Sequence, residues 1–178
     1  MSRRATRAAA IGLGSIALLG LSACGDDADA AVRDGVLTVT LSDFEFGGLP
    51  DEVPAGTRLS IENDSAGELH ELVAVRLADD DDRPVSEVIG DVEQLFAAGP
   101  PAAVLLAAPG GDQIDAVGDG TLNEPGRYIV LCAIPTGVDP DVYLNAASEG
   151  GEGPPDVGAT GAPHFAHGMY AELEVVNP

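Results

Sequence analysis

The chain has few aromatic and sulfur-containing residues, and arginine is its only basic side chain apart from three histidines. Tryptophan and lysine are absent, and aromatic residues make up only 4% of its 178 residues. Hydrophobic residues still make up 45% of the sequence, so a core is available. We therefore expect a single domain whose core is mostly Val, Leu, Ile and Ala.

Positive charge is also scarce, because 8 arginines face 30 acidic residues, a formal net charge of −22. Three arginines precede residue 24 and every acidic residue follows it, so a chain starting at residue 24 carries 5 − 30 = −25. Such a surface repels nucleic acids and anionic lipids. We expect no nucleic-acid partner, and a basic protein as the partner that electrostatic steering would favour.

The first 24 residues predict export. The basic stretch "MSRRATR" precedes "AAAIGLGSIALLGL", which is too short and too glycine-rich for a comfortable membrane span. The closing "LSAC" resembles the lipobox of bacterial lipoproteins, which implies a lipid on Cys24. An ordinary secretory signal cut nearby is the alternative. We expect a protein held by this lipid on the extracytoplasmic side of the cell membrane.

After this signal peptide, residues 25–35 are polar and small and predict a flexible tether. The domain is expected over residues 36–178. In "GVLTVTLSDFEF", Leu37, Val39 and Leu41 fall on one face, as in a half-buried strand. Further strands are expected near Thr57–Glu62, from His70 onward, at Tyr128–Cys132 and in "GMYAELEVV".

Two segments interrupt this pattern of strands. Apolar residues recur at helical spacing between residues 85 and 98, which predicts one amphipathic helix. Residues 135–163 are rich in Gly, Pro, Ala and acid and predict one long loop. Several short strands with Gly/Pro turns and one inserted helix predict an all-β fold, a Greek-key β-sandwich.

The few soft side chains of the domain gather at strand ends and in "PHFAHGM". They are His70, Cys132, His164, His167 and Met169. Taken alone, a cysteine such as Cys132 packs as a small hydrophobe and needs no function. Together, however, one Cys, two His and a weak axial Met are the ligands of a blue-copper electron-transfer site.

Over roughly residues 36–176, the sequence resembles the cupredoxin family. The matching stretches are "VPAGTRLSIENDSAGELHEL", "PGRYIVLC" and "HFAHGM", the last with the H-x4-M spacing of that family. The resemblance implies a cupredoxin-like fold and one copper ion, cycling between Cu(II) and Cu(I), on His70, Cys132, His164 and Met169. His167 matches no ligand position.

One departure from the family concerns the spacing of the ligands. Familiar electron-transfer cupredoxins hold Cys, His and Met on one short loop, whereas 31 residues separate Cys132 from His164 here. Closing a longer loop costs only about 0.6 kcal/mol per doubling of its length. The longer loop is therefore compatible with copper binding at a looser site with slower electron transfer, and equally with an empty site. Loop residues such as Tyr143 or Asp141 are available to cover the site.

Three functions remain open at this stage. The first is a membrane-tethered type 1 copper protein that transfers one electron, for which the expected basic partner is a redox protein. The second is a copper carrier or sequestering protein, and the third is a metal-free cupredoxin-like interaction module. We do not expect an enzyme, because Cys132 ends an apolar strand rather than opening a helix as a cysteine nucleophile often does. Zinc is a weaker fit, since Met is a poor zinc ligand.

Overall fold

A computed structural model describes residues 32–149, 155–158 and 161–178. The expected signal peptide, Cys24 and most of the expected tether lie outside these residues, so those assignments stay predictions. None of the helices in the described part of the chain has the length and hydropathy that a membrane crossing requires. The described chain begins with a short bridge between Arg33 and Val36, just before the first strand.

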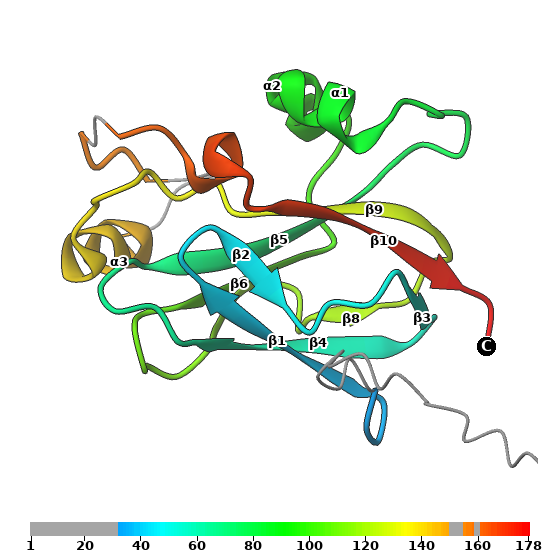
Figure 1. The fold of residues 1–178 in the computed structure, drawn as a ribbon, viewed down its shortest axis with the longest axis horizontal. Coiled ribbons are helices and arrows are strands. Elements are labelled where there is room, and N and C mark those ends of the chain that lie inside the picture. Colours follow the sequence, from blue (N-terminus) through cyan, green and yellow to red (C-terminus); the bar gives the residue numbers. More distant parts are fainter. Residues whose placement is uncertain (1–31, 150–154, 159–160) are drawn as a thin grey trace, which may run out of the picture.

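The strands form two sheets that pack face to face (Figure 1). The four-stranded sheet has the order β2 (Glu45–Gly47), β1 (Val36–Ser42), β4 (Thr57–Asn63), β8 (Thr121–Leu122). The six-stranded sheet has the order β3 (Glu52–Pro54), β10 (Tyr170–Val176), β9 (Gly126–Leu131), β5 (His70–Arg76), β6 (Ala103–Ala107), β7 (Ile114–Val117). Among the strand pairs of the described residues, only β1–β4 and β3–β10 are parallel. The predicted all-β sandwich is confirmed.

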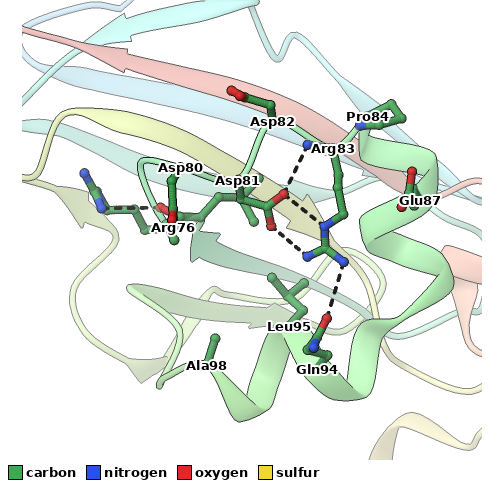
Figure 2. Close-up of a pocket in the computed structure, with 12 residues that line it drawn as sticks. Arg76, Asp80, Asp81, Asp82, Arg83, Pro84, Glu87, Gln94, Leu95 and Ala98 are labelled. Carbon is green, nitrogen blue, oxygen red and sulfur yellow. Dashed lines mark hydrogen bonds and ion pairs between the residues drawn. The ribbon is translucent and has the colours of Figure 1, made fainter.

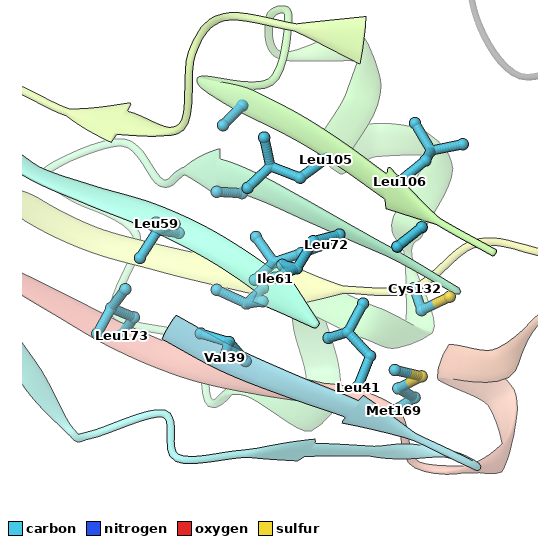
Figure 3. Close-up of a cluster of buried hydrophobic side chains, with 14 of the residues drawn as sticks. Val39, Leu41, Leu59, Ile61, Leu72, Leu105, Leu106, Cys132, Met169 and Leu173 are labelled. Atoms are coloured by element: carbon cyan, nitrogen blue, oxygen red, sulfur yellow. The ribbon is translucent and has the colours of Figure 1, made fainter. Parts of the chain in front are cut away.

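Aliphatic side chains fill the space between the sheets, as the scarcity of aromatic residues led us to expect. On β1, Leu37, Val39 and Leu41 are buried and their neighbours are not, so the predicted alternation is confirmed. Leu59 and Ile61 of β4 meet them in the same cluster (Figure 3). Cys132 and Met169 lie together at one end of this cluster, beside Leu41.

The segment expected to be one helix over residues 85–98 is instead two short helices, α1 (Val85–Gly90) and α2 (Val92–Ala97). The chain leaves the helical region at Asp91, with φ −128° and ψ 47°. Gly90 and Asp91 are both poor helix formers, which makes this the weakest point of the segment. The break lets Val88, Ile89 and Leu95 pack together on the outer face of the six-stranded sheet.

The stretch "GVLTVTLSDFEF" also differs from a single strand, because it folds into a hairpin. Ser42 of β1 pairs with Glu45 of β2, so the chain reverses at Asp43 and Phe44. Phe44 has φ 66°, a left-handed conformation that is unusual for a bulky side chain. The reversal places Asp43 and Phe44 at the end of the sandwich that holds Cys132.

The expected long loop over residues 135–163 contains a helix, α3 (Pro140–Ser148). This helix begins with a common N-terminal capping pattern, which the Gly-, Pro- and acid-rich composition of the segment hides. The Asp139 side chain accepts hydrogen bonds from the backbone N–H groups of Asp141 and Val142, and Pro140 opens the first turn. Tyr143 anchors the helix, since it is buried in the main core.

A groove of about 780 Å³ lies where the end of β5 meets α1 and α2 (Figure 2). Both arginines that line it are already paired with carboxylates, Arg76 with Asp79 and Arg83 with Asp81. The guanidinium group of Arg83 donates two hydrogen bonds to the Asp81 carboxylate, at 2.9 and 2.7 Å. None of the soft side chains singled out in the sequence lines this groove.

Candidate metal centre

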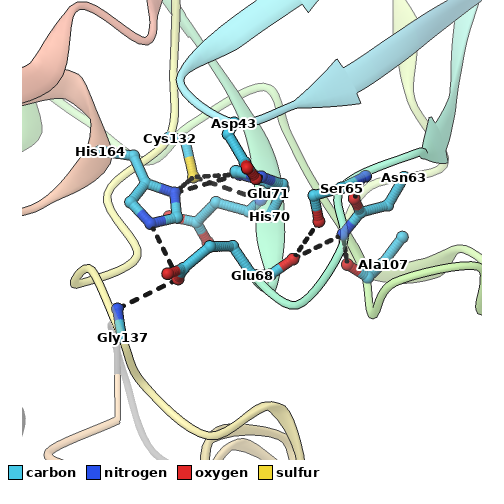
Figure 4. Close-up of polar contacts among 10 residues, drawn as sticks. All are labelled: Asp43, Asn63, Ser65, Glu68, His70, Glu71, Ala107, Cys132, Gly137 and His164. Carbon is cyan, nitrogen blue, oxygen red and sulfur yellow. Dashed lines mark hydrogen bonds and ion pairs between the residues drawn. The ribbon is translucent and has the colours of Figure 1, made fainter.

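Three of the four expected metal ligands meet at one point of the structure (Figure 4). His70 is the first residue of β5, Cys132 directly follows β9, and His164 opens a 3-10 turn, η1 (His164–His167). The Cys132 Sγ lies 3.3 Å from His164 Nδ1 and 3.9 Å from His70 Nδ1, and the two Nδ1 atoms are 3.1 Å apart. All three side chains are fully buried.

Strand pairing brings these residues together. Strands β5 and β9 are antiparallel neighbours with Val73 opposite Leu131, so the start of β5 lies beside the end of β9. The turn η1 is tied to the same place, because the Phe165 N–H donates to the Cys132 carbonyl at 2.9 Å. His70, Cys132 and His164 therefore lie side by side at one end of the six-stranded sheet, although they are far apart in sequence.

The 31 residues between Cys132 and His164 leave and return through a closed neck, formed by residues 134–136 and 162–164. The His164 N–H donates to the Ile134 carbonyl at 3.0 Å. The backbone N–H and the hydroxyl of Thr136 both donate to the Ala162 carbonyl, at 2.9 and 2.8 Å. Backbone hydrogen bonds at the neck therefore hold His164 close to Cys132. A loop of 31 residues does not by itself make the geometry of the donors loose.

Met169, the fourth expected ligand, is fully buried and bonded through its backbone to two members of the cluster. Its N–H donates to the His164 carbonyl at 3.1 Å, and its carbonyl accepts from the Cys132 N–H at 3.1 Å. Its side chain shares the same end of the core as Cys132 (Figure 3). Its role as an axial ligand stays a prediction.

His167 lies outside the cluster. It is exposed, and its ring stacks on Phe44 at a centroid distance of 4.8 Å. Phe44 in turn meets the His164 ring edge-on at 5.2 Å. The left-handed conformation of Phe44 thus places its aromatic ring against His164, on the side of the β1–β2 hairpin.

Without a metal ion, the buried cluster favours the neutral forms of its three side chains. Burial, reinforced by the neighbouring His164, lowers the pKa of His70 to about 4. Burial also lowers the pKa of His164 and raises the pKa of the Cys132 thiol above its usual range. At neutral pH the cluster therefore presents two neutral imidazoles and a thiol, whose proton a metal ion displaces when it binds.

The donor set fits a soft metal ion. Two neutral ring nitrogens 3.1 Å apart repel each other unless a proton or a metal ion lies between their lone pairs. One thiol sulfur and two imidazole nitrogens within 4.8 Å of one another suit copper well. His70, Cys132 and His164 are positioned to bind one copper ion.

Acidic residues around the cluster were not singled out in the sequence, because 30 such residues offer no contrast. Glu71 is 5% exposed, and burial raises the pKa of its carboxyl to about 7. Its carboxylate accepts a hydrogen bond from the Ala133 N–H at 2.9 Å, and its own N–H donates to Cys132 Sγ at 3.4 Å. Glu71 thereby contacts both the cysteine sulfur and the backbone of the residue that follows it.

Tyr143, one of the loop residues expected to cover the site, is buried in the same core cluster as Cys132. Burial raises the pKa of its hydroxyl, and the charges of Glu71 and Cys132 raise it further. Asp141 instead lies in the exposed first turn of α3. The inserted segment therefore closes the core beside the centre through Tyr143 rather than through an acidic side chain.

The turn before β5 is fixed by the buried side chain of Asn63. Its amide group donates to the carbonyls of Glu68 and Ala107, at 3.0 and 2.7 Å, and its oxygen accepts from the Ser65 N–H at 2.9 Å. Ser65 also donates to the Glu68 carbonyl, at 2.7 Å. The asparagine that precedes the first histidine thus fixes where Glu68 and His70 stand.

Known proteins were compared at three levels. No protein-family model and no curated protein sequence matches the chain. Among solved structures, a dithionite-reduced auracyanin from the photosynthetic bacterium Roseiflexus castenholzii is 19% identical, with a TM-score of 0.44 over 80% of this chain and 97% of that one. Auracyanin B is 18% identical, with a TM-score of 0.37 over 79% of this chain and 88% of that one.

Auracyanin A, described as a blue copper protein from the green thermophilic photosynthetic bacterium Chloroflexus aurantiacus, is 17% identical. Its TM-score is 0.41 over 79% of this chain and 99% of that one. Similarities at this level do not assign a function, so the conclusion depends on the sheets and donors of this chain. The two-sheet sandwich and its buried His-Cys-His cluster confirm the resemblance to the cupredoxins, and the chain has a cupredoxin-like fold with donors for one copper ion.

Proposed function

We propose that this protein is a membrane-tethered type 1 copper protein that carries single electrons. The observation that supports it most directly is the convergence of the His70, Cys132 and His164 donor atoms within 4.8 Å of one another. Copper bound there would supply the exchange between Cu(II) and Cu(I). We propose no catalytic role, since the described donors are buried.

Electron transfer is favoured over copper transport by how firmly the donors are held. Each donor residue is fully buried, and each is fixed by backbone hydrogen bonds or strand pairing next to it. Side chains fixed in this way change little between the two copper oxidation states, which keeps electron transfer fast. A carrier would instead need an accessible ligand through which to hand the metal on.

The first test uses residues 25–178, the predicted chain without its signal peptide. All described core residues, from Leu37 to Val175, lie within it, and Cys132 is its only cysteine. Titration with Cu(II) should give an intense visible thiolate-to-copper band that saturates at one equivalent. Cys132→Ala and His164→Ala should abolish the band, while His167→Ala, which alters a residue outside the cluster, should keep it.

The alternatives give different outcomes in the same titration. Tight Cu(I) binding without a reversible redox couple would favour a copper carrier. A colourless protein that retains no copper after desalting would contradict copper binding and favour a metal-free interaction module.

The tether is a separate part of the proposal, supported by the "LSAC" motif alone. The full chain expressed in a bacterial host should fractionate with membranes, and mass spectrometry should find lipid on Cys24. Cys24→Ala should release the protein from the membrane fraction. Membrane association that persists in this variant would contradict anchoring through Cys24.

A further inference from the structure

Each histidine of the metal centre turns its second ring nitrogen toward an acidic side chain. The Nδ1 atoms of His70 and His164 face Cys132, so their Nε2 atoms point outward from the cluster. His164 Nε2 lies 3.5 Å from a Glu68 carboxylate oxygen, and His70 Nε2 lies 3.7 Å from an Asp43 carboxylate oxygen. Figure 4 shows both acids beside the rings that they face.

These two nitrogens need a partner. Both are buried and have no hydrogen bond within the usual distance limit. A buried polar atom that is left without a hydrogen-bond partner destabilises the fold. In each case the facing carboxylate oxygen is already within 4 Å, so a short movement of a flexible acidic side chain completes the bond.

Glu68 is placed for this role by the fold. Its carbonyl is held by Asn63 and Ser65 in the turn before β5. The carboxylate oxygen that faces His164 also accepts the Gly137 N–H, at 3.1 Å. Its side chain is 24% exposed, so it covers the outer edge of His164 while remaining within the turn. Glu68 thus joins the turn before the first histidine to the segment that follows the neck.

Asp43 reaches His70 from the opposite side. It stands at the β1–β2 reversal, next to Phe44, which packs against the His164 ring. The same hairpin therefore contacts both imidazoles, one through a carboxylate and the other through an aromatic ring. Asp43 is the more exposed of the two acids, at 56%.

We propose that Glu68, assisted by Asp43, is a positioning residue of this centre: it accepts the Nε2–H of His164 and so keeps Nδ1 free and aimed at the metal position. A carboxylate bound to the far nitrogen of a metal-binding histidine fixes the tautomer and orientation of the ring and makes it a stronger donor. The negative charge of Glu68 also stabilises the more positive copper state. This inference depends on the proposed function for its metal, but not for the tautomer that it predicts in the copper-free protein.

The experiment uses residues 25–178 and the variants Glu68→Ala and Glu68→Gln. Glu62→Gln is the matched control, because Glu62 carries the same charge on the exposed outer face of β4. Loss of such an outer carboxylate typically weakens metal affinity about 10–100-fold. We expect a loss in this range for Glu68→Ala, a smaller one for Glu68→Gln, and no change for Glu62→Gln.

Two further measurements separate positioning from a structural role. Glutamine can still accept the Gly137 N–H, so a purely structural role of Glu68 predicts a wild-type reduction potential for Glu68→Gln. Positioning by the charged carboxylate predicts a higher potential, since the Cu(II) state loses a stabilising charge. In the copper-free protein, nitrogen NMR should find the Nε2–H tautomer of His164 at neutral pH, and Glu68→Ala should disturb it, whereas Glu62→Gln should not.

The outcomes are distinct for the two proposals. If the unsubstituted protein binds no copper, the proposed function fails, and the NMR result alone decides whether Glu68 holds the tautomer. If the unsubstituted protein is blue, but Glu68→Ala matches it in affinity, potential and His164 tautomer, the inference about Glu68 is overturned while the copper site stands.

Discussion

At the scale of single residues, the metal centre depends on restraints that act on each donor from more than one side. Cys132 receives an N–H donor from Glu71, and its own backbone pairs with Met169. His164 lies between Phe44 and the Glu68 carboxylate. Groups that surround a metal ligand fix its orientation and tune its strength as a donor. The contacts of Glu68 and Glu71 are therefore part of the chemistry of this site.

Met169 gives a prediction at this scale. Replacement by leucine conserves volume and should cost less than about 1.5 kcal/mol of stability. If the thioether is the weak axial ligand, Met169→Leu keeps the blue band but raises the reduction potential, because Cu(II) loses a donor. Voltammetry of the copper-loaded protein measures this. Leu173→Met, the reverse exchange in the same core, should leave the potential unchanged. An unaltered spectrum and potential in Met169→Leu would remove Met169 from the ligand set.

At the scale of elements, the neck closes the inserted segment and so keeps His164 near Cys132 despite their separation in sequence. The segment carries its own helix, α3, capped by Asp139 and anchored in the core by Tyr143. The pairing of residues 134–136 with 162–164 then returns the chain to the point that it left. An insertion of this kind leaves the metal donors in place because its two ends remain adjacent.

Gly161 allows the neck to be tested. A side chain at this position would collide with the carbonyl oxygen of Thr136, so Gly161→Ala must push the two halves apart. Local strain of this kind costs about 1–3 kcal/mol. We expect a lower melting temperature and copper affinity weakened about tenfold, equivalent to about 1.4 kcal/mol. Calorimetry measures both quantities. Gly99→Ala, whose added carbon meets nothing within 4 Å, is the control. Unchanged affinity in Gly161→Ala would show that the neck does not position His164.

The turn between β5 and α1 gives a pH-dependent prediction. Hydrogen bonds from Arg83 lower the pKa of Asp81 from 3.8 to about 2 in the folded protein. The charged carboxylate therefore stabilises the fold at pH values above about 4, and this contribution is lost as the pH falls toward about 2. Asp81→Asn should lower the melting temperature near neutral pH, and the difference from the unsubstituted protein should shrink over that acidic range. Asp80→Asn, at the exposed neighbouring position, serves as the control. A pH-independent difference would contradict this assignment.

At the scale of the whole molecule, the dominant property is negative charge, −22 for the full sequence. The acids also reach the metal centre, where Asp43 and Glu68 stand between the histidines and solvent. A field of this sign attracts cations and repels anions over about one Debye length, roughly 8 Å at physiological salt. The expected basic redox partner remains a proposal, and this field is what supports it.

Small redox reagents can test that field without knowledge of the partner. Oxidation of the reduced copper protein by a cationic cobalt complex should slow as salt is added, because screening weakens the attraction. Oxidation by ferricyanide, an anion, should accelerate under the same conditions. Stopped-flow absorbance at the blue band measures both rates. If neither rate depends on ionic strength, electrostatic steering of a basic partner loses its support.

The class of fold and the cysteine and histidine donors could be predicted from the sequence alone. Leu37, Val39 and Leu41 alternate in the sequence and are buried together in the structure, because side chains of a strand point to alternate faces. His70, Cys132 and His164 stood out because soft side chains are so scarce in this chain. Composition masks the local signals at the Asp139 cap of α3 and at the chain reversal formed by Asp43 and Phe44.

The acids that contact the centre, and the way in which the distant His164 returns to it, became visible only in the folded structure. Glu68 and Glu71 look like any of 30 acidic residues until the strands place one beside His164 and bury the other beside Cys132. The neck between residues 134–136 and 162–164 joins parts of the chain that no local pattern links. Periodicity and residue type act over a few neighbouring residues, whereas the surroundings of a metal donor are set by strand register across the sandwich, which depends on the whole core.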